Sequence, residues 1–404
     1  MVYIPRTVIN LKLLPRKEAK RIILSSFKKP DNMVLLSVPD ACGCISAEPV
    51  YSKRTNPPLL LAGPDGIAVK SAETKKAGED KPVEIEAPRV NTGMPMPEGF
   101  DADIAIEEVT KVAENIYRVH TPVSAYENTI PMGSDIKEGD MILDKGHIIT
   151  PLDIGALLTY GITEIFVKEW KVGLIATGDE IISPYETPMP GQIVNSNSYI
   201  FAAYLKQYKV TPVLYPIIHD NRDAIAEGLK KALGECDMVL VFGGSSAGSK
   251  DFTVDALEES GEILYHGVAM GPGKPVTLAR VNEKPALGMP GPSVSSRTAF
   301  HELVCPLMKQ WGVPVTPDTT VRGVLTQDIP AFGNFDLFMM VKVAEKDGKT
   351  LITPLPRAFG QMNGVRADGI LHKKSGTGAL SAGDEAEVQM LRQNPFSGPE
   401  SSPE

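Results

Sequence analysis

Cysteine is scarce in this chain, and its scarcity excludes a protein held together by disulfide bonds. Only 4 of the 404 residues are cysteine, whereas small secreted scaffolds are dense in them. Cys42 and Cys44 form a C-x-C pair, but a zinc site would need two further ligands at suitable spacing. The other two, Cys236 and Cys305, lie in apolar segments. We therefore expect four small buried side chains and no metal held by cysteine.

The chain also lacks a long apolar run and an excess of positive charge. It has no stretch of about eighteen apolar residues, which a membrane-spanning helix needs, and its first residues lack the apolar core of a signal peptide. The net charge is −9 and the pI is near 5.4. This acidic balance argues against a nucleic-acid or anionic-membrane surface. We expect a cytoplasmic protein that binds neither.

The length of 404 residues is enough for two to four domains. Residues 46–130 hold short β-like runs separated by many prolines and glycines, which predicts a small β domain. From residue 171 onward, strand-like and helix-like runs alternate, and this alternation predicts a parallel sheet with crossover helices. Residues 318–395 return to β-like runs and predict a C-terminal β domain.

Several elements follow from apolar periodicity and from the positions of proline and glycine. The predicted helices are 16–28, 151–160, 198–208, 223–235 and 251–260. The predicted strands of the parallel sheet are 171–177, 209–218 and 237–244. Two Pro-Gly turns, in GPGKP and MPGPSVS, flank a predicted hairpin, VTLA-RVNEKP-ALGM.

Polar residues follow three of the predicted strands, at the edge where open α/β sheets bind ligands. Asp179 and Glu180 follow the first strand, and Asp220 follows the second. The third strand runs into GGSSAGSKD, whose polar and glycine residues are Gly243, Gly244, Ser245, Ser246, Gly248 and Asp251. Glycine lets a backbone approach a ligand closely, and the amides and hydroxyls of such a loop can face phosphate oxygens.

Two interpretations of this edge stay open on the residues alone. Carboxylates that converge without basic partners favour a hard cation such as Mg²⁺, bound beside an oxyanion or phosphorylated substrate. Alternatively, each aspartate caps a helix and the glycine loop is an ordinary turn. The loop is neither a G-x-G-x-x-G fingerprint nor a P-loop.

Taken together, these segments resemble the MoeA family, the molybdopterin molybdenumtransferases, which includes the E-domain of gephyrin. The resemblance runs from about residue 10 to 395 and rests on motifs that occur in the family's order. These motifs are PDGIAVK, NTGMPMPEGFDADIAIEEV, GSDIKEGDMIL, ATGDEI, GQIVNSNSYI, DMVLVFGGSSAGSKDFT, GPGKP and MPGPSVS.

The resemblance implies a multidomain fold that combines α/β and β domains. Its centre would be a three-layer α/β/α molybdopterin-binding domain, joined to an elongated linking domain, a small inserted β domain and a C-terminal β barrel. The implied boundaries are 1–45 with 130–168 for the linking domain, 46–129 for the inserted domain, 169–312 for the α/β domain, 313–396 for the barrel and 397–404 for a disordered tail. A homodimer with its active site between subunits is also implied.

The function implied by the resemblance is a step of molybdenum cofactor biosynthesis. The family reaction inserts molybdate, or tungstate, into adenylylated molybdopterin with Mg²⁺ and releases AMP. A molybdopterin adenylyltransferase and acceptor molybdoenzymes would be its partners. The alternative, from another class of function, is a non-catalytic carrier or scaffold that holds the pterin without turnover.

The resemblance also assigns roles to individual residues. The implied catalytic residues are Asp65, Asp135, Glu180, Asp220, Asp251 and Lys274, of which Glu180, Asp220 and Asp251 would also bind the metal. Lys274 would neutralise an oxyanion, while Ser196 and Asn197 would either reach the pterin or cap a helix. The implied cofactor-binding residues are Thr177, Gly178, Ser196, Asn197, Gly243, Gly244, Ser245, Ser246, Gly248, Pro272, Gly273, Pro290, Gly291 and Ser293.

The chain departs from the family pattern at several of these motifs. Ile67 stands where the family has tyrosine, and Ile130 stands where arginine is usual. Gly271 replaces a lysine ahead of PGKP, and Pro292 replaces an asparagine. These changes remove two cations and several hydrogen-bonding groups while the matched acids stay, which favours an altered preference for the anion, metal or pterin nucleotide.

Overall fold

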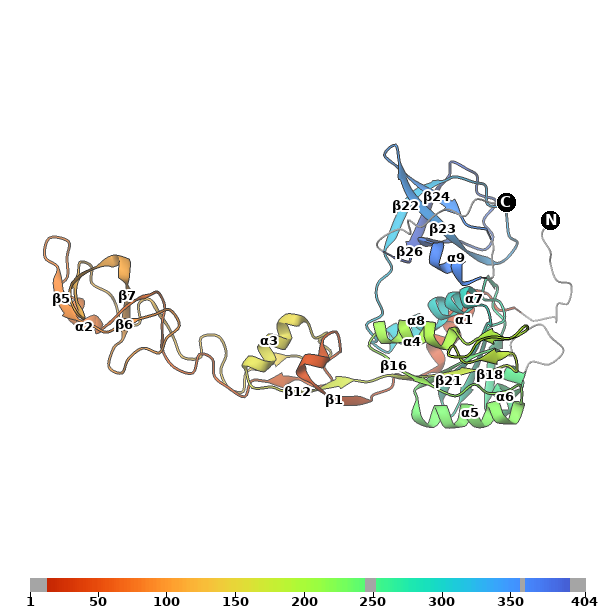
Figure 1. Cartoon of the computed structure of the whole chain (residues 1–404), viewed down its shortest axis with the longest axis horizontal. Helices are drawn as coiled ribbons and strands as arrows, with labels where there is room; N and C mark the ends of the chain where they lie inside the picture. The colour runs from red at the N-terminus through yellow and green to blue at the C-terminus, as the bar shows by residue number, and fades with distance from the viewer. Residues whose placement is uncertain (1–12, 244–251, 357–359, 393–404) are drawn as a thin grey trace. The chain divides into compact units, whose positions relative to one another are not determined.

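The structure is a computed structural model that describes residues 13–243, 252–356 and 360–392 (Figure 1). The chain divides into two units. One comprises residues 33–168, and the other combines the residues before 33 with those from 169 onward. None of the described helices is long and apolar enough to cross a membrane.

A two-stranded ribbon and a short helix build the first part of the 33–168 unit. Its elements are β1 (Met33–Ser37), η1 (Val38–Ala41), β2 (Val50–Tyr51), β11 (Met141–Leu143), α3 (Pro151–Thr159) and β12 (Glu164–Lys168). β1 pairs antiparallel with β12, and β2 pairs with β11. Leu157 of α3 and Ile165 of β12 meet in one buried cluster. A capping box between Thr150 and Asp153 fixes the start of α3, where the sequence predicts a helix.

Two three-stranded antiparallel sheets, ordered β6–β4–β7 and β5–β9–β8, form the second part of this unit. Its elements are β3 (Leu61–Ala62), β4 (Gly66–Val69), α2 (Ser71–Thr74), β5 (Val83–Glu86), β6 (Arg89–Val90), β7 (Ala102–Ala105), η2 (Ile106–Glu108), β8 (Val109–Ala113), β9 (Ile116–Val119) and β10 (Thr129–Ile130). Ile67, at the position where the family has tyrosine, is completely buried among the apolar residues of both sheets. Ile67 is therefore part of the apolar core of this unit.

A six-stranded sheet ordered β16–β13–β17–β21–β20–β18 is the centre of the second unit. Its strands are β13 (Lys171–Ala176), β16 (Thr211–Leu214), β17 (Met238–Phe242), β18 (Glu262–His266), β20 (Thr277–Val281) and β21 (Lys284–Met289). The first four in this order are parallel, and β20 and β18 are added antiparallel. β17 is buried along its whole length, as expected of a parallel strand covered on both faces.

Helices cover both faces of this sheet and confirm the three-layer fold (Figure 1). The helices of the unit's α/β part are α1 (Arg16–Ser26), α4 (Asn197–Gln207), α5 (Arg222–Glu235), α6 (Phe252–Ser260), α7 (Ser293–Ala299), the π-helical η3 (Phe300–Val304) and α8 (Cys305–Gln310). In Figure 1, α5 and α6 lie on one face, and α4 and α8 lie on the other. Leu229 of α5 and Leu257 of α6 are completely buried in the same apolar cluster as Val239 of β17.

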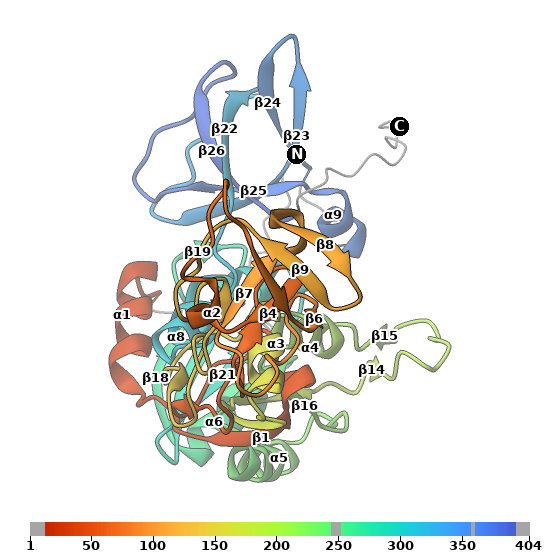
Figure 2. The ribbon, with the colours of Figure 1, turned by 90° about the vertical axis from the view of Figure 1, so that its left-hand side faces the viewer.

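The C-terminal strands close into a five-stranded barrel, as the family resemblance implies (Figure 2). Its elements are β22 (Thr320–Leu325), β23 (Asp336–Lys346), β24 (Lys349–Pro354), α9 (Gln361–Arg366), β25 (Gly369–Lys373) and β26 (Glu385–Met390). The pairing of β23 with both β24 and β25 completes the closure. A short strand of the α/β part, β19 (Met270–Gly271), pairs parallel with the start of β23. Residue 271 therefore lies beside the barrel.

One carboxyl group of the 33–168 unit is buried. Asp103 of β7 is completely buried, and a Cβ at Gly66 would come within 2.5 Å of its Oδ1 atom. Burial raises the pKa of Asp103 to about 6, and the nearby Asp65 carboxylate adds to the shift. The folded state therefore holds this proton at pH values where the unfolded chain has released it, and the group destabilises the fold once it ionises.

We predict that the Asp103→Asn substitution changes the pH dependence of stability. The folded pKa lies above the unfolded value, so the wild type loses stability as the pH rises from about 4 through about 6. The amide of the variant has no proton to lose, so the variant's thermal midpoint should fall less over this range. The exposed Asp80→Asn serves as the control in melts followed by circular dichroism at about pH 4.5 and about pH 7.5. Parallel pH profiles for wild type and Asp103→Asn would contradict this account.

Candidate functional site

A cleft of about 340 Å³ opens at the carboxyl ends of β13 and β17. We call it the polar cleft. Of the residues for which the sequence predicts a role, it is lined by Glu180, Ser196, Asn197, Gly243, Gly291 and Ser293. These residues come from separate stretches of sequence. Parallel strands that end at one edge bring them together, as expected for an open α/β sheet.

Gly243 lies at the end of the polar cleft, at a position that only glycine can occupy. Its φ is 114°, and a Cβ at this position would come within 2.0 Å of the Thr177 carbonyl oxygen. Thr177 in turn donates its backbone N–H to the carbonyl of Phe242, at 2.8 Å. The ends of β13 and β17 are thus in direct backbone contact, and only a residue without a side chain fits between them.

Glu180 is the only ionisable residue among the described residues that line the polar cleft. Its side chain is exposed at the mouth. Gly178 precedes it with a φ of 138°, and a Cβ at Gly178 would come within 2.7 Å of Glu180 Oε2. The left-handed turn at Gly178 therefore leaves the space that this carboxylate occupies.

A hydrogen-bonded chain of side chains crosses the polar cleft. Gln361, at the start of α9, donates from Nε2 to Ser196 Oγ at 2.9 Å. Its Oε1 accepts from the Ser293 hydroxyl at 2.9 Å. Asn197 donates from Nδ2 to the Gly291 carbonyl at 2.7 Å. One carboxamide from the barrel segment therefore orients two serines of the α/β part.

The structure tests the capping alternative for Ser196 and Asp220. Ser196 precedes α4 but makes no capping bond through its side chain, and Asn195 instead accepts from the Ser198 backbone N–H at 3.3 Å. The alternative that Asp220 caps the next helix is wrong, because Asn221 is the cap and accepts from Ala224 N at 2.9 Å. The hydroxyl of Ser196 and the carboxyl of Asp220 stay available for other roles.

Asp220 lies next to the strand-end acids but is not among the residues that line the polar cleft. Its backbone N–H donates to Asp179 Oδ1 at 3.2 Å, and His219 Nδ1 lies 3.1 Å from the same oxygen. Asp220 Oδ1 is buried and has no hydrogen-bond partner in the described part of the chain. A buried, unpartnered carboxylate oxygen suits a hard cation. Within the described residues, however, no three His, Cys, Asp or Glu side chains are grouped closely enough to hold one.

The residues of the two Pro-Gly turns separate into different surroundings. Pro290 is buried, and its carbonyl accepts a hydrogen bond from Ser296 Oγ. Pro272 lines a second, neighbouring pocket. Gly273 has a φ of 114°, and the carbonyl of Lys274 accepts from Val268 N at 2.9 Å. The Lys274 side chain is not among the residues that line either pocket.

Two of the predicted acids belong to the 33–168 unit. Asp135 accepts from Asn56 Nδ2 at 2.8 Å and from the Tyr160 hydroxyl at 2.7 Å, and these two bonds lower its pKa. Asp65 accepts from Thr92 N at 2.9 Å. Both side chains are held in place by neighbours within their own unit. Five other predicted residues lie outside the described residues: Gly244, Ser245, Ser246, Gly248 and Asp251.

Sequence reasoning missed two polar residues of the polar cleft, Asn195 and Gln361. Asn195 immediately precedes the predicted pair Ser196 and Asn197, so extending the predicted segment by one residue would have found it. Gln361 lies 165 residues away from Ser196. The only signal for it is its place in FGQMNGVRADG, a stretch with a loose likeness to the family pattern.

Two family models match the chain in the order of its parts. Residues 14–161 match the MoeA N-terminal region, described as domains I and II. Residues 173–310 match the family described as "Probable molybdopterin binding domain". The second match spans the sheet and helices that form the polar cleft.

Similar proteins agree with these matches. A protein of Methanocaldococcus jannaschii named for molybdopterin biosynthesis is 31% identical over 312 residues, which cover 72% of this chain and 78% of the relative. The molybdopterin molybdenumtransferase of Bacillus subtilis is 28% identical over 407 residues, 94% of each chain. Two crystal structures of a molybdopterin biosynthesis MoeA protein from Pyrococcus horikoshii superpose with TM-scores of 0.78 and 0.69, at 27% and 26% identity over 94% of this chain and 100% of theirs. The chain belongs to the MoeA family of molybdenum cofactor biosynthesis, and several of its relatives are named molybdopterin molybdenumtransferases.

Proposed function

We propose that this protein is a molybdopterin molybdenumtransferase that inserts molybdate, or tungstate, into adenylylated molybdopterin and releases AMP. The observation that carries the proposal is the polar cleft itself, where an exposed carboxylate, Glu180, faces a cluster of oriented hydroxyls and amides. The names of the relatives point to the same chemistry. We also propose that the protein works in the cytoplasm as a homodimer, with a molybdopterin adenylyltransferase and acceptor molybdoenzymes as its partners.

In the proposed complex, both backbone groups and side chains of the polar cleft contribute to binding. Gly243 lets the end of β17 pack against the Thr177 carbonyl of β13, and this backbone contact forms the end of the cleft in which we propose the ligand binds. Ser196 accepts from Gln361, so its hydroxyl proton can be donated to the ligand's phosphate or pterin oxygens. Ser293 donates to Gln361 and therefore offers the ligand an acceptor oxygen. Gly291, held by Asn197, completes this side of the cleft.

In the proposed reaction, Glu180 acts on a water molecule beside the phosphoanhydride. Its carboxylate is acceptor-only when ionised, so it can orient a water or take a proton from it as the bond to the adenylyl phosphorus forms. The phosphoanhydride bond then breaks, and AMP leaves. Asp65, Asp135 and Lys274 keep the roles that the family resemblance gives them.

We include Mg²⁺ in the proposed reaction, as the family resemblance implies. Glu180, Asp220 and Asp251 would supply carboxylate oxygens, and Asp220 Oδ1 is a buried oxygen with no described partner. Oxygen ligands of this kind suit Mg²⁺. Once bound, the ion would neutralise charge on the substrate's phosphates.

A second candidate function is a carrier that binds the pterin without turnover. One observation favours it: none of the described residues that line the polar cleft is basic. Phosphoryl chemistry gains much of its acceleration from positive charge at the transferring group. A cleft with few cations would therefore bind the pterin nucleotide more readily than it would catalyse the release of AMP.

Release of AMP separates the two functions. Purified protein, adenylylated molybdopterin, Mg²⁺ and molybdate are incubated, and AMP is measured by chromatography. We expect AMP to accumulate over several turnovers and to depend on Mg²⁺. Tight binding of the pterin nucleotide without AMP release would identify the carrier and remove the enzyme from consideration.

We predict that Glu180→Gln lowers kcat for AMP release by about 10²-fold, because the amide neither accepts a proton nor carries charge. Glu186→Gln is the matched control, since Glu186 is an exposed glutamate of the loop that follows. Rates are measured at saturating substrate. Equal rates for the two variants would exclude Glu180 from the reaction.

We predict that Gln361→Leu raises KM for the pterin nucleotide by about tenfold and changes kcat less, because the serines lose their common partner. Gln207→Leu, at the exposed end of α4, is the control. Steady-state kinetics of AMP release give both constants. An unchanged KM for Gln361→Leu would mean that the hydrogen-bonded chain across the cleft does not contact the ligand.

A further inference from the structure

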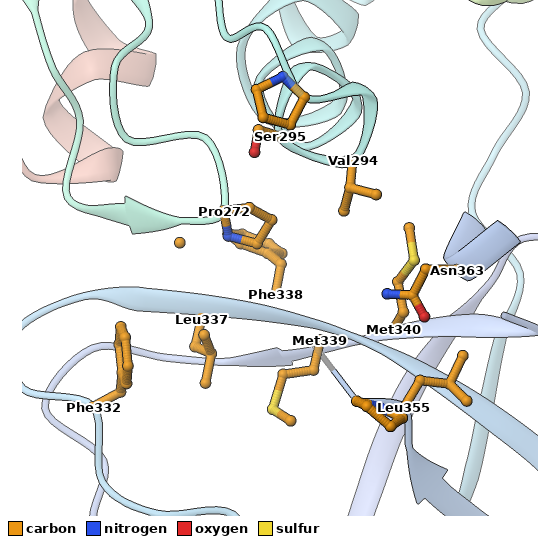
Figure 3. A pocket seen from close by; sticks show the side chains of 13 residues that line it. Pro272, Val294, Ser295, Phe332, Leu337, Phe338, Met339, Met340, Leu355 and Asn363 are labelled. Atoms are coloured by element: carbon orange, nitrogen blue, oxygen red, sulfur yellow. The ribbon is translucent and has the colours of Figure 1, made fainter. Parts of the chain in front are cut away.

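A second pocket, of about 230 Å³, lies between the α/β part and the barrel of the same unit (Figure 3). We call it the apolar pocket. Its walls are formed by residues around Pro272 and Pro292, by the start of α7, and by β23 with the residues after β24. None of the 13 described residues that line it is ionisable. This composition is opposite to what a site for a charged group requires.

The floor of the apolar pocket is part of the barrel's packed structure. Leu337 is 4% exposed, Phe338 is 9% exposed and Met340 is 7% exposed. Phe338 also stacks on His372 with ring centroids 4.4 Å apart. Because these side chains are packed from behind, the pocket is formed before any ligand arrives.

The rest of the lining offers an exposed ring and two polar groups. Phe332 is 37% exposed. Ser295 of α7 and Asn363 of α9 face the pocket in Figure 3. A hydroxyl and a carboxamide beside apolar walls suit a flat ring that carries both donors and acceptors on its edge.

Gly271 explains why the pocket is uncharged. It lies at the position where the family resemblance expects lysine, and it lines the apolar pocket. A Cβ built there would meet only Phe332, at 3.8 Å. A lysine would therefore have room to enter this space, and its absence leaves the pocket without that cation.

We propose that the apolar pocket binds an uncharged, flat heteroaromatic ring whose polar edge is bound by Asn363 and Ser295. Pro292 lines both this pocket and the polar cleft, so one extended ligand can occupy both. The proposal rests on the proposed function in one respect: the ring would be the pterin or the adenine of adenylylated molybdopterin. A metal oxyanion is excluded from this pocket, because a buried charge without a partner is costly.

Direct binding of small probes tests the proposal without turnover. Biopterin and adenosine, both uncharged near neutral pH, are titrated separately into the full-length protein by isothermal calorimetry, and molybdate is added as a competitor. We expect one of the two rings to bind and molybdate not to displace it. The ring that binds shows whether the pterin or the adenine of adenylylated molybdopterin occupies the apolar pocket. Binding of neither ring, or displacement by molybdate, would overturn the proposal.

A matched pair of substitutions locates the binding. Val294 lines the apolar pocket from α7, whereas Val365 of α9 is 42% exposed and does not line it. Val294→Lys should weaken ring binding by at least about tenfold, because its ammonium group would be desolvated beside the ring. Val365→Lys should leave binding unchanged. Equal affinities for the two variants would contradict the assignment.

A third variant keeps the proposal testable if Val294→Lys unfolds, which its thermal midpoint will show. Gly271→Lys should weaken ring binding and make it sensitive to molybdate, because it places a cation in open space. Unchanged ring binding in this variant would also overturn the proposal. AMP release by the wild type is a separate readout: if it fails while the ring binds, the proposed function fails and the ring site stands.

Discussion

The close approach of β13 and β17 at their carboxyl ends is the constraint on which the rest of the site depends. Gly243 lies so near the Thr177 carbonyl that a Cβ would come within 2.0 Å of it. This contact ends both strands at the same level and places Glu180 at the mouth of the polar cleft. The parallel pairing of the two strands, buried on both faces, makes that level hard to change.

The barrel contributes to the same region through two connections. β19 pairs with the start of β23, which places Gly271 beside the barrel, and Gln361 bridges Ser196 and Ser293. The polar cleft and the apolar pocket then share Pro292. The arrangement suits a ligand with a polar end and a flat apolar end. Gly271, at the position where the family resemblance expects lysine, leaves the second end without that cation.

The parts of this architecture that depend on local sequence could be predicted, and the parts that depend on distant contacts could not. The predicted helix at 151–160 is α3, because Thr150, Pro151 and Asp153 specify its start within four residues. Local pattern also predicted that Glu180 and Gly243 lie at one edge, since parallel strands end there, whereas Asp179 and Asp220 do not line the polar cleft. Gln361 and β19 escaped prediction because their partners are far away in sequence and are set by barrel closure. The capping role given to Asp220 failed because the neighbouring Asn221 has the better capping geometry.

The central claim is that one pterin nucleotide occupies both the polar cleft and the apolar pocket. A crystal structure of the protein soaked with adenylylated molybdopterin tests it most directly. The account predicts the ligand's phosphates beside Gly243 and Glu180 and one of its rings between Val294 and Phe332, with its edge on Asn363. A ligand bound elsewhere on the protein, or one whose rings both leave the apolar pocket empty, would contradict it.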